Sequence, residues 1–455
     1  MRRSVVINVV GLSERVIDTH TPFLQSWSRR IPKNHIKPQV PAVTCSVQTT
    51  YLTGQPPSVH GIVGNGWYFK DECEIKFWRQ SNKLVEAPKI WEAARKFDPN
   101  FTCANLFWWY NMYSSVDYSV TPRPNYLADG RKIPDVYSHP PQLRDHLQQR
   151  LGQFPLFEFW GPKTTIRSSK WIANAAISIE KQYQPTLSLV YLPHLDYCLQ
   201  KFGHSSEKIS GDLEEVDQLI EVLVTFYEDR GVHVILLSEY GITEVSNPIS
   251  LNRILRKKGW LQVREERGLE LLDAGASKAF AVADHQVAHV YVNNSQDIPK
   301  VRSTLEEVDG VAEVWGAEEK SINQMDHHRS GDLMVLARPD SWFTYYYWFD
   351  DARAPDFART VAIHQKPGYD PVEMFADPNI KWLMPLVGWK LLKKKLGFRV
   401  LMDIIPLDPL LIRGSHGIVP KDQVDWPVLF ANGLTPGATL SATGVYQMIW
   451  DQLTN

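Results

Sequence analysis

Short apolar runs recur along the chain and predict buried β-strands. They are rich in β-branched side chains and end at polar residues or glycine. The runs cover residues 5–10, 187–192, 232–237 and 287–292. Residues 212–230 place apolar side chains at helical spacing, and Gly231 follows as a helix stop. Strands that alternate with helices favour an α/β fold, with a mostly parallel central sheet flanked by helices on both faces.

In a sheet of this kind, functional side chains gather on the loops that follow the carboxyl ends of the strands. The segments that meet this description begin at Gly11, His194 and Ser238, and a further one is the turn near His285. We therefore expect the functional residues in these segments.

Aromatic residues are concentrated in two regions that break the strand and helix rhythm. The chain of 455 residues holds 16 Trp, 18 Tyr and 18 Phe. Residues 66–165 contain FWWYNMY, and residues 341–410 contain WFTYYYWFDD. We interpret both regions as insertions in a single domain, residues 1–455, which form a cap over the sheet. The rings would either select a substrate or fill the space between cap and sheet.

Charge and cysteine content exclude several classes of protein. Lys and Arg number 49 against 51 Asp and Glu, so the chain lacks the basic excess that favours nucleic-acid binding. The four cysteines form no CxxC pair, which argues against a disulfide framework. No apolar stretch approaches the roughly 20 residues of a transmembrane helix, and the first apolar run resembles a strand more than a signal peptide. We expect a cytoplasmic protein.

The most informative segment is residues 41–69, PAVTCSVQTTYLTGQPPSVHGIVGNGWYF. Thr44 opens a helix-like stretch that Gly54 closes, and the string around His60 leads to Asn65. This spacing resembles the nucleophile segment of the alkaline phosphatase superfamily, in its nucleotide pyrophosphatase/phosphodiesterase branch. The resemblance implies that Thr44 is a nucleophile, that Asn65 donates to a phosphoryl oxygen, and that His60 contacts substrate. Taken alone, Thr44 has the simpler interpretation of a helix N-cap.

The segments that resemble metal-binding motifs depart from the family pattern. The family uses two zinc ions, but the first strand ends in Val10-Gly11 without its carboxylate. At other motif positions, this chain has Gln200 and Tyr240 where the family has histidine, and Glu239 where the family has aspartate. Asp196 and His416 match the family. The resemblance thus implies at most one divalent ion, zinc or manganese, held by Asp196, Glu239 and His416, with Gln200 a weaker ligand. The alternative is no metal at all.

A few other residues are candidates for the same cleft. Tyr240 has the interpretations of a phenolate ligand, a proton donor or a buried structural residue. His285 lies just before an apolar run and is a candidate replacement ligand. The string HQKPGYDP, which begins at His364, also occurs in phosphodiesterase-like relatives. It places His364 as a further candidate ligand and Asp370 as a candidate substrate contact.

These features lead to one main function and two alternatives. The main one is a phosphoester hydrolase or phosphoryl-transfer enzyme that acts on a small phosphorylated molecule. The first alternative is a non-hydrolytic protein that binds a phosphorylated or prenylated ligand. The second is a metal-independent enzyme whose acid and base groups include Thr44, Tyr240, Glu239 and His416. The chain is also similar to a divergent bacterial subgroup, which implies a role in the biosynthesis of a specialised metabolite.

One basic segment allows contact with a membrane surface. Residues 389–398, WKLLKKKLGF, combine aromatic and aliphatic side chains with a run of lysines. The simpler expectation is a helix docked on the protein with its lysines in solvent. Contact with a membrane surface is the alternative.

Overall fold

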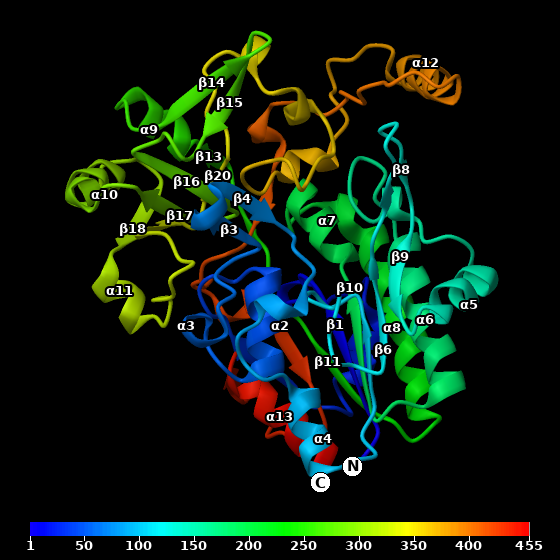
Figure 1. Ribbon diagram of the computed structural model, residues 1–455. Helices are drawn as coiled ribbons and strands as arrows, with labels where there is room; N and C mark the ends of the chain where they lie inside the picture. Colours follow the sequence, from blue (N-terminus) through cyan, green and yellow to red (C-terminus); the bar gives the residue numbers. More distant parts are fainter. Residues whose placement is uncertain (455) are drawn as a thin grey trace.

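A nine-stranded sheet forms the centre of the computed structural model, which describes residues 1–454 (Figure 1). In spatial order, its strands are β23 (Thr439–Ser441), β2 (Lys33–Lys37), β22 (Val428–Phe430), β11 (His233–Leu237), β1 (Ser4–Val9), β10 (Leu187–Leu192), β5 (Cys103–Leu106), β6 (Tyr118–Pro122) and β9 (Val136–His139). The middle strands, from β11 to β6, run parallel, and antiparallel pairs occur towards both edges. All residues of β1 and β10 are buried, as expected for strands covered on both faces. The predicted mostly parallel α/β sheet is therefore confirmed.

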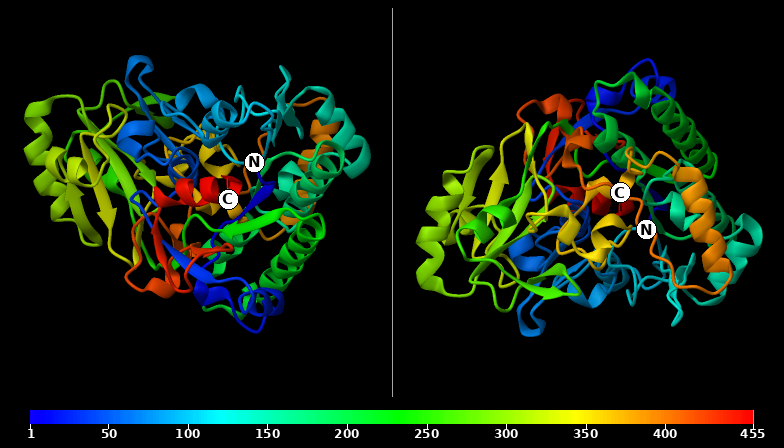
Figure 2. Two further views of the ribbon diagram at one scale, coloured as in Figure 1. Left: turned by 90° about the horizontal axis from the view of Figure 1, so that it is seen from below. Right: turned by 90° about the horizontal axis from the view of Figure 1, so that it is seen from above.

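Helices cover both faces of this sheet (Figures 1 and 2). One face packs against α5 (Gln142–Leu151), α6 (Arg167–Tyr183) and α8 (Ser210–Glu228), and the other against α2 (Thr44–Thr53), α4 (Ile90–Phe97) and α13 (Gly444–Thr454). The remaining helices are α1 (Pro22–Trp27), α3 (Pro57–His60), α7 (His194–Phe202), α9 (Leu251–Lys257), α10 (Ile298–Glu306), α11 (Ala317–Ile322) and α12 (Leu383–Lys395). The predicted helix over residues 212–230 corresponds to α8, and Gly231 follows it with a φ of 65°.

A second, antiparallel sheet has its own hydrophobic core. Its strands, in spatial order, are β16 (Ala279–Asp284), β17 (Val287–Val292), β19 (Leu333–Ala337) and β18 (Val311–Trp315). The apolar run over residues 287–292 is therefore a strand, but it does not belong to the parallel sheet. Only two residues connect β16 to β17, and such a short connection permits antiparallel pairing alone.

Short strand pairs occur outside the two sheets. They are β3 (Gly66–Phe69) with β4 (Glu74–Phe77), β7 (Asn125–Tyr126) with β8 (Lys132–Ile133), β12 (Thr243–Glu244) with β21 (Gly414–Ser415), β13 (Asn247–Ile249) with β20 (Ser341–Phe343), and β14 (Gln262–Glu266) with β15 (Leu269–Asp273). Residues 66–165, expected as an aromatic-rich insertion, thus supply β5, β6 and β9 of the central sheet as well as two hairpins.

The two ends of the second aromatic region behave differently. Tyr345, Tyr346, Tyr347 and Trp348 are at most 1% exposed and pack into the core of the antiparallel sheet, so these rings fill the core. Helix α12, by contrast, has no buried residue and projects from the body of the molecule (Figure 1). The expectation that this helix docks on the protein is therefore wrong. Within residues 1–454, no helix combines the length and the apolar character needed to cross a bilayer.

Gly241, which follows β11, provides a direct test of this architecture. It bridges to Gly11 beyond β1, and a Cβ atom built on it would lie 1.7 Å from the Asp425 carbonyl oxygen. Gly241→Ala should therefore lower the free energy of unfolding by about 3 kcal/mol. Denaturant titration would measure this change.

The matched control for that variant is Gly211→Ala in α8. A Cβ atom there would have no heavy atom within 4 Å, and the residue is exposed. This substitution should leave the stability unchanged or raise it by up to about 1 kcal/mol. Equal effects of the two substitutions would contradict the close approach at Gly241.

Candidate active site

The carboxyl ends of three parallel strands meet the beginning of α2. After β1, the Leu12 amide donates to Ser238 Oγ at 3.1 Å, on the loop that follows β11. Glu239 and Tyr240 continue that loop, and Asp196 lies in the first turn of α7, after β10. The side chains that follow these strands therefore lie together at the beginning of α2.

Thr44 is the first residue of α2, and its side chain does not cap the helix. The N-cap is Val43, in an extended conformation, and no side chain caps the helix end. The hydroxyl oxygen of Thr44 instead lies 2.9 Å from the hydroxyl oxygen of Tyr240. The interpretation of Thr44 as a helix N-cap is thus wrong. The hydroxyl is held beside the positive end of the helix, where negative charge is stabilised.

Tyr240 connects Thr44 to a buried carboxyl group. Its hydroxyl donates towards Asp196 Oδ1 at 3.5 Å. Burial raises the pKa of Asp196 to about 7, with Gln200 and Tyr240 partly opposing that rise. Burial and the nearby acids Asp196 and Glu239 raise the pKa of Tyr240 well above its usual value. Without a bound metal ion, Tyr240 is therefore a protonated phenol at neutral pH.

The carboxyl group of Glu239 is held by two amides. Asn8 Nδ2 and Gln48 Nε2 each donate to Oε1 at 2.5 Å, whereas Oε2 is buried without a hydrogen-bond partner within residues 1–454. Burial raises the pKa of Glu239 to about 8, and hydrogen bonds from Gln48, Asn8 and Thr44 oppose the rise. At neutral pH the group is thus protonated, and the two amides on Oε1 direct the proton to Oε2.

Asn65 is oriented by contacts on both sides of its amide group. The Cys45 backbone amide donates to Oδ1 at 3.0 Å, and Nδ2 donates to Asp284 Oδ1 at 3.1 Å. The Asn65 backbone amide also donates to Asp284 Oδ2 at 2.8 Å. Asn65 therefore lies at the start of α2, beside Thr44, and one N–H of its side chain is already used by Asp284.

Stacked rings connect the two sheets at this site. Tyr369 stacks on His285 with ring centroids 3.7 Å apart, His285 on His416 at 3.8 Å, and His416 on Tyr240 at 3.6 Å. We call these residues the ring stack. His285 has a φ of 62°, a left-handed conformation that is strained for a side chain of this size. Burial lowers the pKa values of His285 and His416 well below the usual value, so both rings are neutral at pH 7.

The available donor atoms do not fit the two-metal centre that the motif resemblance implies. His416 Nδ1 donates to the Ala42 carbonyl at 2.7 Å, which leaves the Nε2 lone pair free, 3.8 Å from Asp196 Oδ1. Tyr369 donates to Gln200 Oε1 at 3.0 Å, and the Glu239 oxygen Oε1 accepts two amides. Asp196, His416 and Glu239 Oε2 retain free donor atoms, but the ligand atoms of these three side chains do not all lie within 4.8 Å of one another. A catalytic zinc ion typically has three protein ligands.

Clusters of metal-ligand type do occur elsewhere in the described chain. They are Glu86 with His327 and His328, and His194 with Asp212 and Glu215. Neither cluster contains Asp196, Glu239 or His416, so the three predicted ligands do not converge on one position. The single-ion site at these residues stays a prediction.

Three further predicted residues make their contacts elsewhere. His60 is fully buried, and its ring bonds to Thr50 Oγ1 at 2.9 Å and to the Ile62 amide at 3.1 Å, so both nitrogens have structural partners. His364 lies 3.3 Å from the Phe77 carbonyl oxygen. Asp370 pairs with the buried Lys366 at 2.7 Å. These contacts place none of the three residues against Thr44.

Sequence reasoning missed several members of the site. Tyr369 precedes Asp370 in the same string, and its hydroxyl and ring reach Gln200 and His285. Asn8 is the sole polar side chain in the middle of an otherwise apolar strand, a signal that could have identified it. Gln48 had no such signal, because its partner comes from a distant part of the chain.

Partly exposed tryptophans surround the outer end of the ring stack. Trp78 lies 4.9 Å from Trp109 and 6.1 Å from Tyr369, and Trp160 lies 5.8 Å from Tyr369, as distances between ring centroids. The backbone amide of Trp109 donates to Gln48 Oε1 at 2.7 Å, so these rings adjoin the Glu239 network. We call Trp78, Trp109 and Trp160 the tryptophan rim.

Positive charge accompanies this rim. After burial, the side chains that lower the pKa of the neighbouring His364 are Arg79, Lys132 and Arg123. None of these three cations has a carboxylate within 4.0 Å in the part of the chain that the structure describes. Their charge is therefore available to an anionic ligand.

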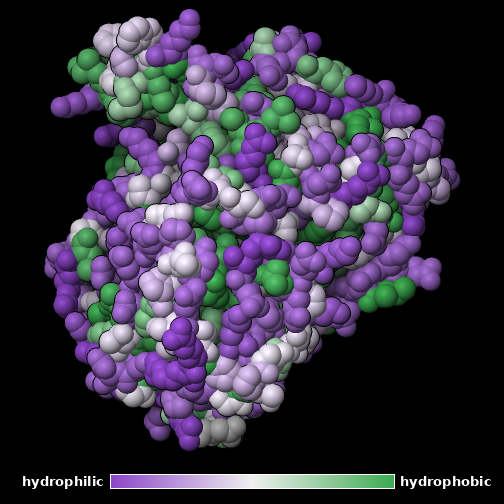
Figure 3. All heavy atoms as spheres, turned by 180° about the vertical axis from the view of Figure 1, so that it is seen from behind, coloured by the Kyte–Doolittle hydropathy of each residue, from purple (hydrophilic) through white to green (hydrophobic). Residues whose placement is uncertain are grey.

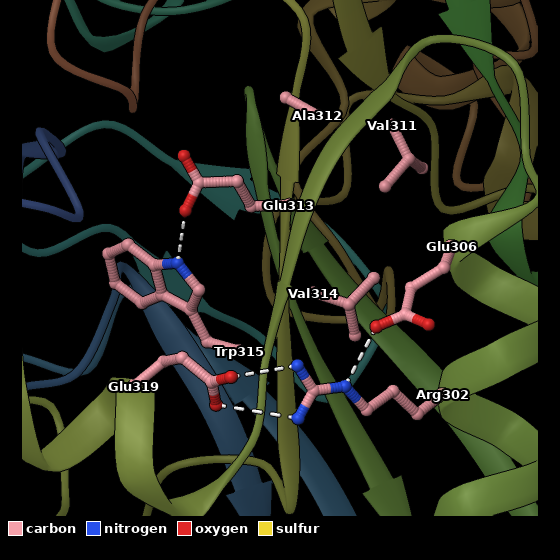
Figure 4. Close-up of a pocket in the computed structure, with 8 residues that line it drawn as sticks. All are labelled: Arg302, Glu306, Val311, Ala312, Glu313, Val314, Trp315 and Glu319. Carbon is pink, nitrogen blue, oxygen red and sulfur yellow. Dashed lines mark hydrogen bonds and ion pairs between the residues drawn. The ribbon is translucent and has the colours of Figure 1, made fainter.

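A separate surface pocket of about 250 Å³ lies between α10, β18 and α11 (Figure 4). Arg302 there donates to Glu306 and to Glu319, each at 2.8 Å, and the hydrogen bond from Arg302 lowers the pKa of Glu319 to about 2. Its one cation is already paired with these glutamates, and the pocket contains none of the predicted site residues. We therefore do not consider it an active site.

Known proteins with similar sequences are pyrophosphatases and phosphodiesterases. An uncharacterized pyrophosphatase/phosphodiesterase of Schizosaccharomyces pombe is 25% identical over 270 residues, 57% of this chain and 47% of the relative. An ectonucleotide pyrophosphatase/phosphodiesterase of Caenorhabditis elegans is 22% identical over 237 residues, 50% of this chain and 26% of the relative. The matched region thus covers less than half of each relative.

Solved structures share the fold over the whole chain. Phosphonoacetate hydrolase from Sinorhizobium meliloti, in complex with phosphonoformate, has a TM-score of 0.63 and 14% identity, over 100% of this chain and 96% of that chain. An inactive form of murine ectonucleotide pyrophosphatase/phosphodiesterase 5, in complex with AMP, has a TM-score of 0.60 and 13% identity, over 100% and 95%.

The family model for type I phosphodiesterase / nucleotide pyrophosphatase matches residues 4–370, which include Thr44, Asn65, Asp196, Glu239 and Tyr240. This match covers most of the chain. The protein therefore belongs to the type I phosphodiesterase / nucleotide pyrophosphatase family of hydrolases, within the alkaline phosphatase superfamily.

Proposed function

We propose that the protein cleaves a phosphoester bond in a small phosphorylated molecule, with Thr44 as the nucleophile. The observation that carries this proposal is the chain of contacts from the Thr44 hydroxyl to Tyr240, at 2.9 Å, and from Tyr240 to Asp196, at 3.5 Å. A threonine hydroxyl attacks phosphorus only when a base takes its proton. In this site, Asp196 is the base, and Tyr240 relays the proton.

The first step forms a bond between Thr44 Oγ1 and phosphorus while the bond from phosphorus to the leaving oxygen breaks. The Thr44 proton moves to the Tyr240 oxygen as the Tyr240 proton moves to Asp196. The leaving oxygen takes its proton from solvent. Water then attacks the phosphothreonine and releases a proton to solvent, and the proton on Asp196 returns through Tyr240 to Thr44. Transfer to another hydroxyl compound in place of water would give a phosphoryl-transfer enzyme.

Two features of the site support negative charge on the phosphoryl group. The beginning of α2, at Thr44, offers the positive end of the helix dipole. The proton on Glu239 Oε2 has no partner among residues 1–454 and is free to donate to a phosphoryl oxygen. We propose that Glu239 acts in its protonated form and that no step requires a bound metal ion.

The tryptophan rim and its cations support a substrate that carries a flat or apolar group beside the phosphate. Aromatic side chains stack on planar groups, and Arg79, Arg123 and Lys132 attract the anionic group. The relative solved with AMP and the one solved with phosphonoformate both hold small ligands of this charge.

A non-hydrolytic protein that binds such a ligand is the alternative, and the 3% exposure of Thr44 favours it.

Thr44→Ala should abolish turnover of bis(4-nitrophenyl) phosphate and 4-nitrophenyl phosphate, with a loss of about 1,000-fold or more in kcat. Acid-quenched wild type should contain phosphothreonine at position 44 by mass spectrometry. Thr53→Ala, at the other end of α2, is the matched control. Its hydroxyl bonds only within the helix, to the Thr49 carbonyl and the Gln55 amide, so full turnover should remain. Retained ligand binding by a wild type without turnover would instead support the binding protein.

The pH dependence of kcat/KM should be bell-shaped. Asp196 must lose its proton, so the rate rises with pH through about 7, and Glu239 must keep its proton, so the rate falls through about 8. Because the two acids interact, the apparent pKa values read from the two limbs describe the coupled pair and not the individual groups. Glu239→Gln keeps a neutral donor and should remove the alkaline limb. Asp196→Asn should lower the rate about 100-fold or more and remove the acidic limb. An unchanged alkaline limb in Glu239→Gln would refute this role.

Chelation should leave turnover unchanged. Purified protein treated with EDTA should keep its kcat, and elemental analysis should find no stoichiometric zinc or manganese, because the ligand atoms of Asp196, Glu239 and His416 do not all lie within 4.8 Å of one another. A two-zinc relative treated in parallel should lose activity. Inactivation by EDTA that added zinc reverses would contradict the metal-free proposal.

A further inference from the structure

The loop that carries α12 is tied to the body of the protein at its two ends. The Asp377 amide donates to the Ile404 carbonyl at 2.7 Å, and the next residue, Ile405, is 1% exposed. Between these ends, residues 378–403 form an excursion that we call the α12 loop. No residue of its helix is buried, and the loop projects at the end of the molecule opposite both termini (Figure 1).

The α12 loop exposes large apolar side chains in a group. Trp382 is 75% exposed, Met384 73%, Leu396 67% and Phe398 63%. Further members with large exposure are Trp389, Leu391, Leu392 and Leu401. Hydrophobic and hydrophilic residues stand together on the projecting corner, seen from behind at the upper left in Figure 3. Contiguous apolar surface of this kind on a folded protein indicates a binding surface.

The charge of the loop has a single sign. No Asp or Glu occurs between Asp377 and Asp403. The cations in this interval are Lys381, Lys390, Lys393, Lys394, Lys395 and Arg399. Among the described residues, Lys390 alone of these has a carboxylate within 4.0 Å, on Asp403. The apolar side chains are therefore accompanied by unpaired positive charge.

A second basic and apolar element lies beside the loop. Arg399 Nη2 donates to the Ala128 carbonyl at 2.9 Å, in the turn between β7 and β8. That hairpin exposes Tyr126 at 56% and Ile133 at 37%. Both elements lie at the same upper corner of the molecule in Figure 1. The surface thus extends beyond a single helix.

We propose that the α12 loop and the β7–β8 hairpin bind the surface of an anionic lipid bilayer. The exposed apolar side chains of α12 cover about half of the helix circumference, which is broader than the stripe that a partner helix covers. The acyl chains of a bilayer are fluid, so they can cover such a surface without a groove of matching shape. The tryptophans prefer the boundary between headgroups and acyl chains, and the lysines attract anionic headgroups. The apolar part, residues 382–392, is too short to span a bilayer, so the helix lies in the interface. This binding is independent of the proposed reaction.

Vesicle flotation with the full chain tests the proposal. Wild type should float with vesicles of 70% phosphatidylcholine and 30% phosphatidylserine and bind much less to pure phosphatidylcholine vesicles. Binding should weaken as salt rises. Lys393→Glu with Lys395→Glu should lower affinity for the anionic vesicles at least 30-fold, whereas Lys257→Glu with Lys258→Glu, an exposed pair on α9, should change it less than threefold.

The apolar contribution needs its own pair of variants. Trp389→Ser should lower vesicle affinity about tenfold or more, and Ile322→Ser, which replaces a 73% exposed side chain on α11, should leave it unchanged. Brominated lipids should quench tryptophan emission of wild type, and the double variant Trp382→Phe with Trp389→Phe should lose that quenching.

Two results would overturn the proposal. One is the absence of flotation with anionic vesicles at low salt. The other is a stable dimer in analytical ultracentrifugation that dissociates in Trp389→Ser and does not bind vesicles, because this surface would then serve a second copy of the chain.

Discussion

The ring stack is the constraint on which the site depends. Tyr369, His285, His416 and Tyr240 lie face to face, and they come from distant parts of the chain. Two charged imidazoles would repel each other at 3.8 Å, so the stack requires neutral rings, and burial provides them by lowering both histidine pKa values. The stack also fixes the Tyr240 ring, and therefore holds its hydroxyl at Thr44. The left-handed backbone at His285 is the local strain that this arrangement tolerates.

Glu239, Tyr240 and Gln200 each contact side chains from distant parts of the chain. A glutamate at position 239 reaches the amides of Asn8 and Gln48, and the Gln48 oxygen in turn accepts the Trp109 backbone amide. A tyrosine at position 240 stacks on His416 and bonds to Thr44. Gln200 accepts the hydroxyl of Tyr369. Each substituted side chain thus has a specific partner. Glu239 Oε2, Gln200 Nε2 and His416 Nε2 are nevertheless buried without a hydrogen-bond partner among residues 1–454, at a cost of about 1–3 kcal/mol each unless a ligand satisfies them.

The sequence predicted the parts of this arrangement that depend on local pattern. Apolar runs identified β10 and β17 to the residue, and the spacing around Thr44 identified α2 and its glycine stop. The site also needs contacts between segments far apart in the chain, and these have no local pattern. His285 illustrates the difference, because its position before a strand was visible, but its ring partners Tyr369 and His416 were not. The same limit applies to α12, whose apolar pattern suggested docking although no surface of the protein receives it.

Burial favours the protonated forms of the acidic groups in this site. Asp196, Glu239 and Asp284 are all buried, and burial raises their pKa values to about 7, 8 and 6. Three carboxylates in one dry site cannot all be ionised, since each added negative charge is opposed by burial and by its neighbours. The site therefore keeps protons at neutral pH. Because Oε1 of Glu239 accepts two amides, its proton has a defined position, and Asp196, which titrates near pH 7, is the group that exchanges protons most easily.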